Sequence, residues 1–247
     1  MILELHAVGK QFSDMVVIPG LSMFVQEGEF VGVIGPNGAG KTTLFGLIAG
    51  SLRCDRGDVL LDGVSLRDLD AGARCRAGIG RTFQIPQPFE SMTVYENALV
   101  SAVYGAGLRG DQARSFAFDA LDRCGLAEWG DAEAGSLTLL QRKRLELARA
   151  MATRPRLLLL DEVAGGLTDN EMTQLLNLVV AINREGVTVL WIEHLVHALV
   201  SVARRLVVLA EGSIVADGNP NVLMQDQVVR DVYLGSEVEA EGSNAPH

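Results

Sequence analysis

Apolar and polar residues in the first third of the chain fall into short runs bounded by glycine and acidic residues, a pattern typical of β-strands. The run Phe30–Ile34 contains no polar side chain, so it predicts a strand buried on both faces. Asp62-Gly63 stands between two apolar stretches and predicts a hairpin turn. The strands predicted here are 2–8, 21–26, 30–34, 58–61, 64–66 and 79–84.

Between Thr93 and Thr153 the spacing of apolar residues changes to that of helices. Beyond this stretch, segments typical of strands and of helices alternate. The predicted helices are 43–49, 94–103, 111–124, 141–151, 170–185, 195–202 and 220–234, and the later strands are 156–160, 187–192, 206–210 and 213–215. This order predicts an α/β core interrupted by a helical insertion.

Composition agrees with strands covered by helices. The chain has 247 residues, 48% of them hydrophobic, and a mean hydropathy of +0.23, which suits one large domain. No apolar run approaches the ~20 residues that a membrane-spanning helix needs, and the first residues lack the basic region and apolar core of a signal peptide. We therefore expect a cytoplasmic protein.

The formal net charge of −10 and the isoelectric point near 4.9 argue against a nucleic-acid partner, which usually requires a basic face. The basic cluster Arg142-Lys143-Arg144 is expected to be a solvated helix face or a contact for carboxylates of a partner protein. Cys54, Cys75 and Cys124 fit neither a zinc pattern nor a Cys-x-x-Cys pair, so we expect buried, reduced thiols.

The most informative motif occupies residues 35–42. Gly35-Pro36-Asn37-Gly38-Ala39-Gly40-Lys41-Thr42 fits the phosphate-binding pattern Gly-x-x-x-x-Gly-Lys-Ser/Thr. Its glycines let backbone N–H groups converge on phosphate, and the helix after it directs its N-terminus at the anion. Lys41 would bind the outer phosphates, and the Thr42 hydroxyl would ligate Mg²⁺. A strand before the motif and a helix after it predict binding of a nucleoside triphosphate.

A leucine run later in the chain ends in two carboxylates. Leu157–Leu160 predicts a buried strand, which puts Asp161 and Glu162 at the carboxyl edge of the sheet, where open α/β folds bind ligands. Mg²⁺ prefers oxygen ligands, and one carboxylate beside a hydroxyl and phosphate oxygens is a usual arrangement. Asp161 is therefore a candidate metal ligand. Glu162 is placed to orient or deprotonate an attacking water.

With these two motifs in order, the chain resembles ATP-binding cassette (ABC) proteins, the motor subunits of ATP-driven transporters, over nearly its whole length. The resemblance implies a phosphate-loop NTPase (RecA-like) α/β core with an antiparallel β subdomain and an inserted α-helical subdomain. It implies one domain over 1–234, with the core in 1–85 and 155–234 and the insertion at approximately 86–154. Residues 235–247 are expected to be a disordered tail.

The resemblance also implies roles for single residues. Gln84 matches the Q-loop glutamine that touches Mg²⁺ and water, His194 matches the histidine that contacts the γ-phosphate, and Phe12 matches the aromatic that stacks on adenine. The implied catalytic residues are Lys41, Gln84, Glu162 and His194, and the implied metal ligands are Thr42, Gln84 and Asp161. The implied nucleotide-binding residues are Phe12, Gly35, Asn37, Gly38, Ala39, Gly40, Lys41, Thr42 and Thr43, with ATP and Mg²⁺ as cofactors.

Within the family, one subgroup fits best. Arg81-Thr82-Phe83-Gln84, Met92–Asn97 and Ile192-Glu193-His194 are similar to the first of two ATPase subunits in importers of branched-chain amino acids, and Gln141–Ala150 and Tyr233-Leu234-Gly235 agree. Importers of urea and short amides use similar subunits, so the solute stays open. The lipopolysaccharide-export ATPase is a second alternative. The resemblance implies membrane permease partners that dock on the helical insertion, at the inner face of the cell membrane.

The chain departs from its family at the signature Leu-Ser-Gly-Gly-Gln, which is Leu137-Thr138-Leu139-Leu140-Gln141 here. In the family each ATP lies between the phosphate loop of one subunit and the signature of the other, so Thr138 and Gln141 would act in trans. Leu139 and Leu140 add side chains where the backbone should approach phosphate. The resemblance therefore implies a heterodimer with one weaker ATP site, and a homodimer stays possible.

Two more departures point the same way: Val163 replaces the family's proline, and Thr168 replaces the usual aspartate of the D-loop. A nucleotide-binding regulatory subunit with weak hydrolysis is the rival that these changes favour. The intact Glu162 and His194 oppose it.

Overall fold

The computed structural model describes residues 1–232 and consists of two units. The first unit contains Met1–Asp68 and the chain from Leu190 onward, and the second contains Leu69–Val189. The boundary falls inside strand β8, Thr188–Ile192. The expected tail at 235–247 lies outside the described residues.

An antiparallel sheet forms one part of the first unit. Its strands follow the order β2-β1-β4-β5, with bounds Met15–Val25, Leu3–Phe12, Arg56–Leu61 and Val64–Ser65. Strands β1 and β2 are longer than predicted because pairing continues to Phe12 and Met15 at the end of their hairpin. The predicted turn at Asp62-Gly63 is confirmed, with φ of 51° and 72°.

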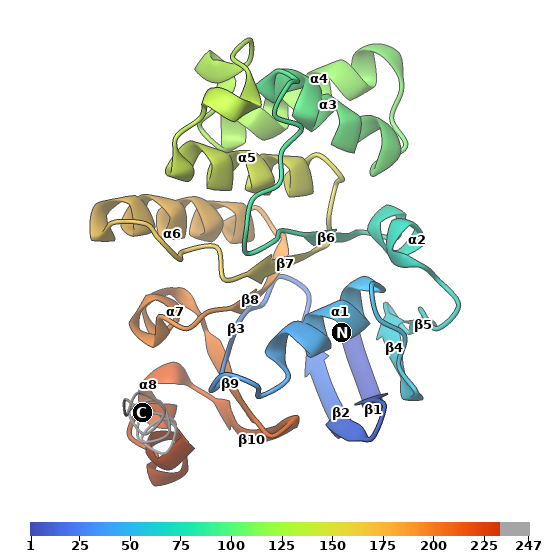
Figure 1. The fold of residues 1–247 in the computed structure, drawn as a ribbon, viewed down its shortest axis with the longest axis vertical. Helices are drawn as coiled ribbons and strands as arrows, with labels where there is room; N and C mark the ends of the chain where they lie inside the picture. Colours follow the sequence, from blue (N-terminus) through green and yellow to red (C-terminus); the bar gives the residue numbers. More distant parts are fainter. Residues whose placement is uncertain (233–247) are drawn as a thin grey trace, which may run out of the picture. The chain divides into compact units, whose positions relative to one another are not determined.

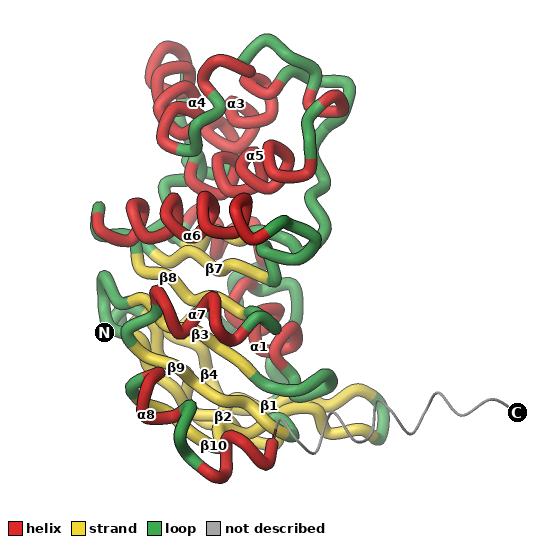
Figure 2. The backbone as a smooth tube through the Cα atoms, turned by 90° about the vertical axis from the view of Figure 1, so that its left-hand side faces the viewer, coloured by secondary structure: helices red, strands yellow, loops and turns green. Residues whose placement is uncertain are grey.

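A second group of strands carries the buried core of this unit. Strand β3 (Phe30–Ile34) is buried throughout and runs parallel to β9 (Arg205–Ala210), which pairs antiparallel with β10 (Ser213–Gly218). Strand β10 also contacts β2, as Figure 2 shows. The helices here are α1 (Lys41–Ala49), α7 (Val196–Val202) and α8 (Pro220–Leu223).

The second unit combines a parallel strand pair with helices. Strands β6 (Ile79–Arg81) and β7 (Leu157–Asp161) are parallel. The helices are α2 (Ala71–Arg76), α3 (Val94–Tyr104), α4 (Gly110–Arg123), α5 (Leu139–Met151) and α6 (Asp169–Arg184), with short 3₁₀ turns at Ala127–Trp129 and Ala134–Ser136. Helices α3, α4 and α5 pack together as one cluster (Figure 1).

Threonine residues decide where three of these helices begin. Thr93, Thr138 and Thr168 are the N-caps of α3, α5 and α6, and each forms a capping box with the residue three positions later. A capping box satisfies backbone N–H groups that the first helical turn leaves unpaired. Among residues 1–232, no helix combines the length and the apolar character that crossing a membrane requires.

Three sequence-based predictions need correction. The strand predicted at 79–84 ends at Arg81, because the chain then turns toward Pro86 and Pro88, which have no N–H group for a sheet. The helix predicted at 220–234 is broken: α8 ends at Leu223, and a new helical stretch starts at 227, where Asp226 accepts from the Val228 amide. Of the three cysteines, only Cys124 is buried, whereas Cys54 and Cys75 are half-buried.

Candidate functional site

The loop between β3 and α1 has the backbone that its glycines predict. Gly38 and Gly40 adopt left-handed φ angles of 78° and 93°, which residues with a Cβ rarely adopt, and Gly40 is the N-cap of α1. A Cβ on Gly35 would lie 2.1 Å from the carbonyl oxygen of Leu209. The first glycine is thus needed for close packing against β9, and the later two shape a concave row of N–H groups.

Lys41 is buried at the start of α1, with 5% of its surface exposed. Its Nζ donates hydrogen bonds to the carbonyl oxygens of Gly35 (2.7 Å) and Pro36 (2.9 Å). A lysine ammonium on a flexible stem can exchange carbonyl oxygens for phosphate oxygens. Thr42 is exposed in the first helical turn, where the helix dipole favours an anion and the hydroxyl oxygen can ligate the cation that accompanies it. The remaining loop residues are Asn37 (exposed), Ala39 (buried) and Thr43 (half-buried).

Two other predicted site residues belong to the same unit. Phe12 ends β1 with 41% of its surface exposed, and Lys10 Nζ lies 5.3 Å from its ring centroid. His194 is exposed just after β8. The residue before it, Glu193, is buried and accepts a hydrogen bond of 3.1 Å from Trp191 Nε1.

In the second unit, β7 delivers the two carboxylates as predicted. Asp161 is the last residue of β7 and is 5% exposed. Glu162 follows with φ of 49°, in the left-handed region. A non-glycine residue in such a sparsely populated conformation costs roughly 1–3 kcal/mol, and such residues cluster at functional sites.

Each carboxylate has a partner from the β6 side. Gln84 Nε2 donates to Glu162 Oε2 at 2.5 Å, and Arg81 Nη2 donates to Asp161 Oδ2 at 2.9 Å. The structure therefore brings Gln84 to Glu162, two residues that the sequence predicts for the same chemistry. Arg81 is a site residue that the sequence motifs do not reveal, since only strand pairing brings it to Asp161.

The donor set suits a magnesium ion that arrives with phosphate. Among residues 1–232, no group of three or more His, Cys, Asp and Glu side chains could hold a metal alone. Mg²⁺ in proteins usually takes one or two carboxylates and completes its shell with water and phosphate oxygens. Within the second unit, Asp161 supplies a buried carboxylate, and Gln84 retains an amide oxygen while its nitrogen donates to Glu162.

The altered signature lies at the start of α5. Thr138 and Gln141 bond to each other: the Thr138 amide and hydroxyl donate to Gln141 Oε1 at 2.9 and 3.0 Å, and the Gln141 amide donates back to Thr138 Oγ1 at 3.4 Å. Leu139 is 44% exposed, and its Cδ2 lies 3.3 Å from the position of a Cβ on Gly166. Thr168, the other departure, caps α6 in the same way.

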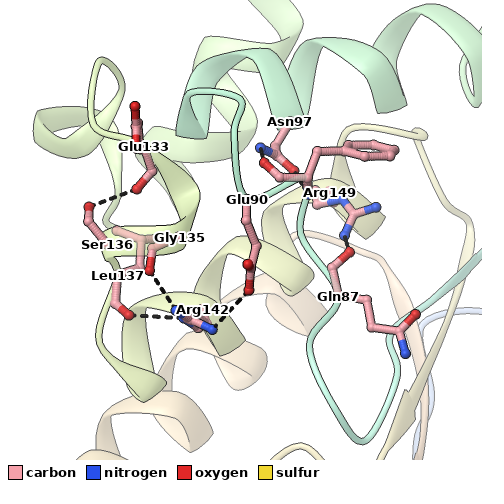
Figure 3. Close-up of polar contacts among 10 residues, drawn as sticks. Gln87, Glu90, Asn97, Glu133, Gly135, Ser136, Leu137, Arg142 and Arg149 are labelled. Carbon is pink, nitrogen blue, oxygen red and sulfur yellow. Dashed lines mark hydrogen bonds and ion pairs between the residues drawn. The ribbon is translucent and has the colours of Figure 1, made fainter.

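Of the two expectations for the basic cluster after the signature, the solvated helix face is wrong for Arg142 and Lys143, and the contact with carboxylates of a partner protein stays a prediction. Arg142 Nε and Nη2 donate to the carbonyl oxygens of Leu137 (3.0 Å) and Gly135 (2.6 Å), and its Nη1 lies 3.5 Å from Glu90 Oε1 (Figure 3). Lys143 is 4% exposed. These bonds hold the loop that leads into the signature.

A second arginine of α5 holds the segment after Gln84. Arg149 Nη1 donates to the Gln87 carbonyl oxygen at 2.8 Å (Figure 3). It also donates to Glu146 Oε2 at 2.8 Å, and its guanidinium lies 5.3 Å from the Phe89 ring centroid. Asn97 of α3 donates to the Phe89 carbonyl and accepts from its amide. Burial raises the pKa of Glu146, although Arg149 opposes the shift.

Comparisons with known proteins match the chain to a family. The model of the family described as "ABC transporter" matches residues 18–165. The chain is 36% identical over 249 residues, with 95% of this chain and 98% of the relative covered, to the high-affinity branched-chain amino acid transport ATP-binding protein BraF of Pseudomonas aeruginosa. It is 32% identical to the lipopolysaccharide export system ATP-binding protein LptB of Haemophilus influenzae, with 96% and 98% covered.

Solved structures confirm the predicted fold class. The ADP conformation of MJ1267, an ATP-binding cassette of an ABC transporter, matches with a TM-score of 0.86 and 29% identity, over 95% of this chain and 98% of that one.

Proposed function

The chain belongs to the ABC transporter family, and we propose that it is the ATP-hydrolysing motor subunit of an importer for branched-chain amino acids or a related small polar or amide solute. The observation that carries this proposal is the end-to-end similarity to BraF, at 36% identity over 95% of the chain. The phosphate loop with buried Lys41 and the two partnered carboxylates support the catalytic part.

Each site residue has a proposed role in hydrolysis. Phe12 stacks on the adenine ring, and the amides of the loop, at Gly35, Asn37, Gly38, Ala39, Gly40 and Thr43, surround the phosphates. Lys41 exchanges its carbonyl partners for β- and γ-phosphate oxygens. Glu162 orients and deprotonates water under control of Gln84, and His194 stabilises the γ-phosphate as it leaves.

Asp161, Thr42 and Gln84 are the proposed ligands of Mg²⁺ or of its bound water. Magnesium, when bound with ATP, neutralises charge on the β- and γ-phosphates. The chain's own part is to offer oxygen atoms and to hold the Asp161 carboxylate in place through its ion pair with Arg81.

Partners and location follow from the family as proposals. Permease subunits would dock on the insertion at approximately 86–154 of a single domain over 1–234, and the chain would sit at the inner face of the cell membrane. A second ABC ATPase subunit would complete each ATP site, with Thr138 and Gln141 facing the partner's ATP. Because Leu139 and Leu140 fill the place of two glycines, we favour a heterodimer in which that second site is weaker.

Two rivals remain distinct. A regulatory subunit would bind ATP with little hydrolysis, and the leucines of the signature favour it. A lipopolysaccharide-export ATPase is favoured by the 32% identity to LptB. Assays of amino-acid transport by the chain assembled with its permease subunits would distinguish a lipopolysaccharide-export ATPase from an amino-acid importer.

The catalytic part is tested by Glu162→Gln in the purified assembly. Loss of a general base lowers the rate by roughly a hundredfold to ten-thousandfold, while ATP binding should persist. Glu211→Gln is a matched control, because Glu211 is an exposed glutamate with nearly the same left-handed φ, 48°. An already low ATPase rate that Glu162→Gln leaves unchanged would support the regulatory subunit instead.

A further inference from the structure

Arg81 lies against Asp161 because of the register of two parallel strands. Arg81 of β6 pairs with Leu159 of β7, and Asp161 stands two residues further on the same face. The Thr82 amide donates to the Leu159 carbonyl at 2.9 Å, and the Asp161 amide lies 3.4 Å from Thr82 Oγ1. Backbone pairing therefore fixes both ends of the Arg81–Asp161 contact.

The ion pair between Arg81 and Asp161 is largely buried. The side chains of Arg81 and Asp161 are 15% and 7% exposed, and the guanidinium also lies 5.1 Å from the Phe83 ring centroid. Ion pairs on open surfaces are screened by water and salt, whereas this one is shielded. Arg81 Nη2 bonds to Oδ2, so we take Oδ1 as the carboxylate oxygen that Asp161 can offer to another cation.

A carboxylate held through one oxygen distinguishes between divalent cations. Mg²⁺ requires a near-ideal octahedron, keeps several waters and is served by one carboxylate oxygen. Ca²⁺ takes six to eight oxygens and readily binds both oxygens of one carboxylate. Because Arg81 holds Oδ2, Asp161 offers one oxygen. One oxygen is enough for Mg²⁺, whereas Ca²⁺ loses the second oxygen that it readily binds.

We propose that Arg81 is a positioning residue that limits Asp161 to one oxygen and thereby selects Mg²⁺ over Ca²⁺ in the nucleotide complex. This inference rests on the proposed function, since it requires that the chain bind a nucleoside triphosphate with a divalent ion. The competing explanation is an ion pair that only stabilises the fold.

The test measures binding rather than turnover. The affinity of the full chain for a non-hydrolysable ATP analogue is titrated calorimetrically with Mg²⁺ and with Ca²⁺, and the ratio of the two Kd values is compared. In Arg81→Met we expect the preference for Mg²⁺ to fall about tenfold, mainly through tighter binding with Ca²⁺. Arg205→Met is the matched control, because Arg205 is equally buried and bonded to Asp217 in the other unit. It should lower thermal stability and leave the ratio unchanged.

Arg81→Lys keeps the inference falsifiable if Arg81→Met does not fold. Lysine keeps the charge that buried Asp161 needs but lacks the planar, fixed donors of arginine, so we expect an intermediate ratio. A ratio within twofold of the original in the Arg81 variants, with nucleotide still bound, overturns the inference and leaves the proposed function standing. Failure of the unmodified chain to bind the analogue with either ion overturns both.

Discussion

Gln84 and Glu162 are joined by a hydrogen bond of 2.5 Å between Nε2 and Oε2. The glutamine comes from the segment after β6 and the glutamate from the end of β7, on backbone with a positive φ. One side chain thus orients the other at the place where water would be activated.

Gln84→Ala should lower kcat for ATP hydrolysis by about tenfold to a hundredfold. A lost hydrogen bond to a charged group corresponds to roughly 1.5–3 kcal/mol, and here the lost bond is the one that orients Glu162. Steady-state kinetics of the assembled transporter measure this. Gln87→Ala is the matched control, because Arg149 uses only the backbone carbonyl of Gln87. Equal effects of the two substitutions would contradict the role given to Gln84.

Leu139→Gly combined with Leu140→Gly should raise turnover of the assembled complex by up to about tenfold to a hundredfold. The change removes side chains that stand where backbone approaches phosphate, and one restored charge-assisted hydrogen bond is worth roughly 1.5–3 kcal/mol. Leu139→Ala with Leu140→Ala is the control, since it keeps both Cβ atoms and should recover less. If the glycine variant turns over at the original rate, the idea of a weak second site fails.

Thr138→Ala and Thr168→Ala form a matched pair. Each removes an N-cap hydroxyl from a capping box, so each should lower the free energy of unfolding by about 1 kcal/mol. Only Thr138→Ala should also weaken ATP-dependent association with the partner ATPase, because only Thr138 belongs to the signature. Urea denaturation gives the first quantity and analytical ultracentrifugation gives the second. Equal loss of association in both variants would mean that Thr138 acts only as a helix cap.

Arg149→Met should destabilise the second unit by about 3–5 kcal/mol at neutral pH, because it leaves Glu146 buried without its ion-pair partner. Burial already raises the pKa of Glu146 above its ordinary value of 4.5, and Arg149 opposes this. At pH values between 4.5, the pKa of the unfolded chain, and the raised pKa of the folded chain, the folded state binds more protons than the unfolded state. The free energy of unfolding is therefore greatest below this pH range and falls as the pH rises through it.

Removing Arg149 removes the charge that opposes the rise in the pKa of Glu146, so the pH range over which stability falls extends upward. The variant should therefore lose more stability with rising pH than the unmodified chain. Adding Glu146→Gln removes the titrating group and should flatten the difference. Denaturant titrations at several pH values measure both effects. A pH dependence that the double variant leaves intact would mean that another group is responsible.

The thiol of Cys124 should resist alkylation in the folded protein. Burial raises its pKa to about 12, so almost no reactive thiolate exists near pH 8. Mass spectrometry after iodoacetamide treatment should find Cys124 modified only once the chain is unfolded. Rapid labelling under native conditions would show that this helix end opens readily.

Local sequence patterns predicted those elements whose limits are set locally. The five residues of β3 end where Gly35 begins the loop, and the bounds 30–34 are confirmed. The hairpin at Asp62-Gly63 needs only two residues with positive φ. Helix α2 was missed, because six residues of Ala-Gly-Ala-Arg-Cys-Arg have no apolar period, although Asp70 caps it.

The residues of the candidate site also divide into those that a local motif predicts and those that only the fold brings together. The phosphate loop is contiguous, so Lys41 and its glycines could be predicted from spacing alone. The pairing of Arg81 with Asp161 joins residues 80 positions apart, and it depends on the register of β6 and β7, which no short motif encodes. The solvated face expected at 142–144 was wrong for a related reason: the carbonyl groups that Arg142 binds are made available by the fold of the preceding loop.

The carbonyl oxygens of Gly35 and Pro36 serve Lys41 as built-in acceptors. When a product leaves, the ammonium therefore returns to neighbours already in place, and no bare positive charge is stranded in a dry interior. Recovery between rounds of turnover would then need only a movement of the Lys41 side chain, with no rearrangement of the loop backbone.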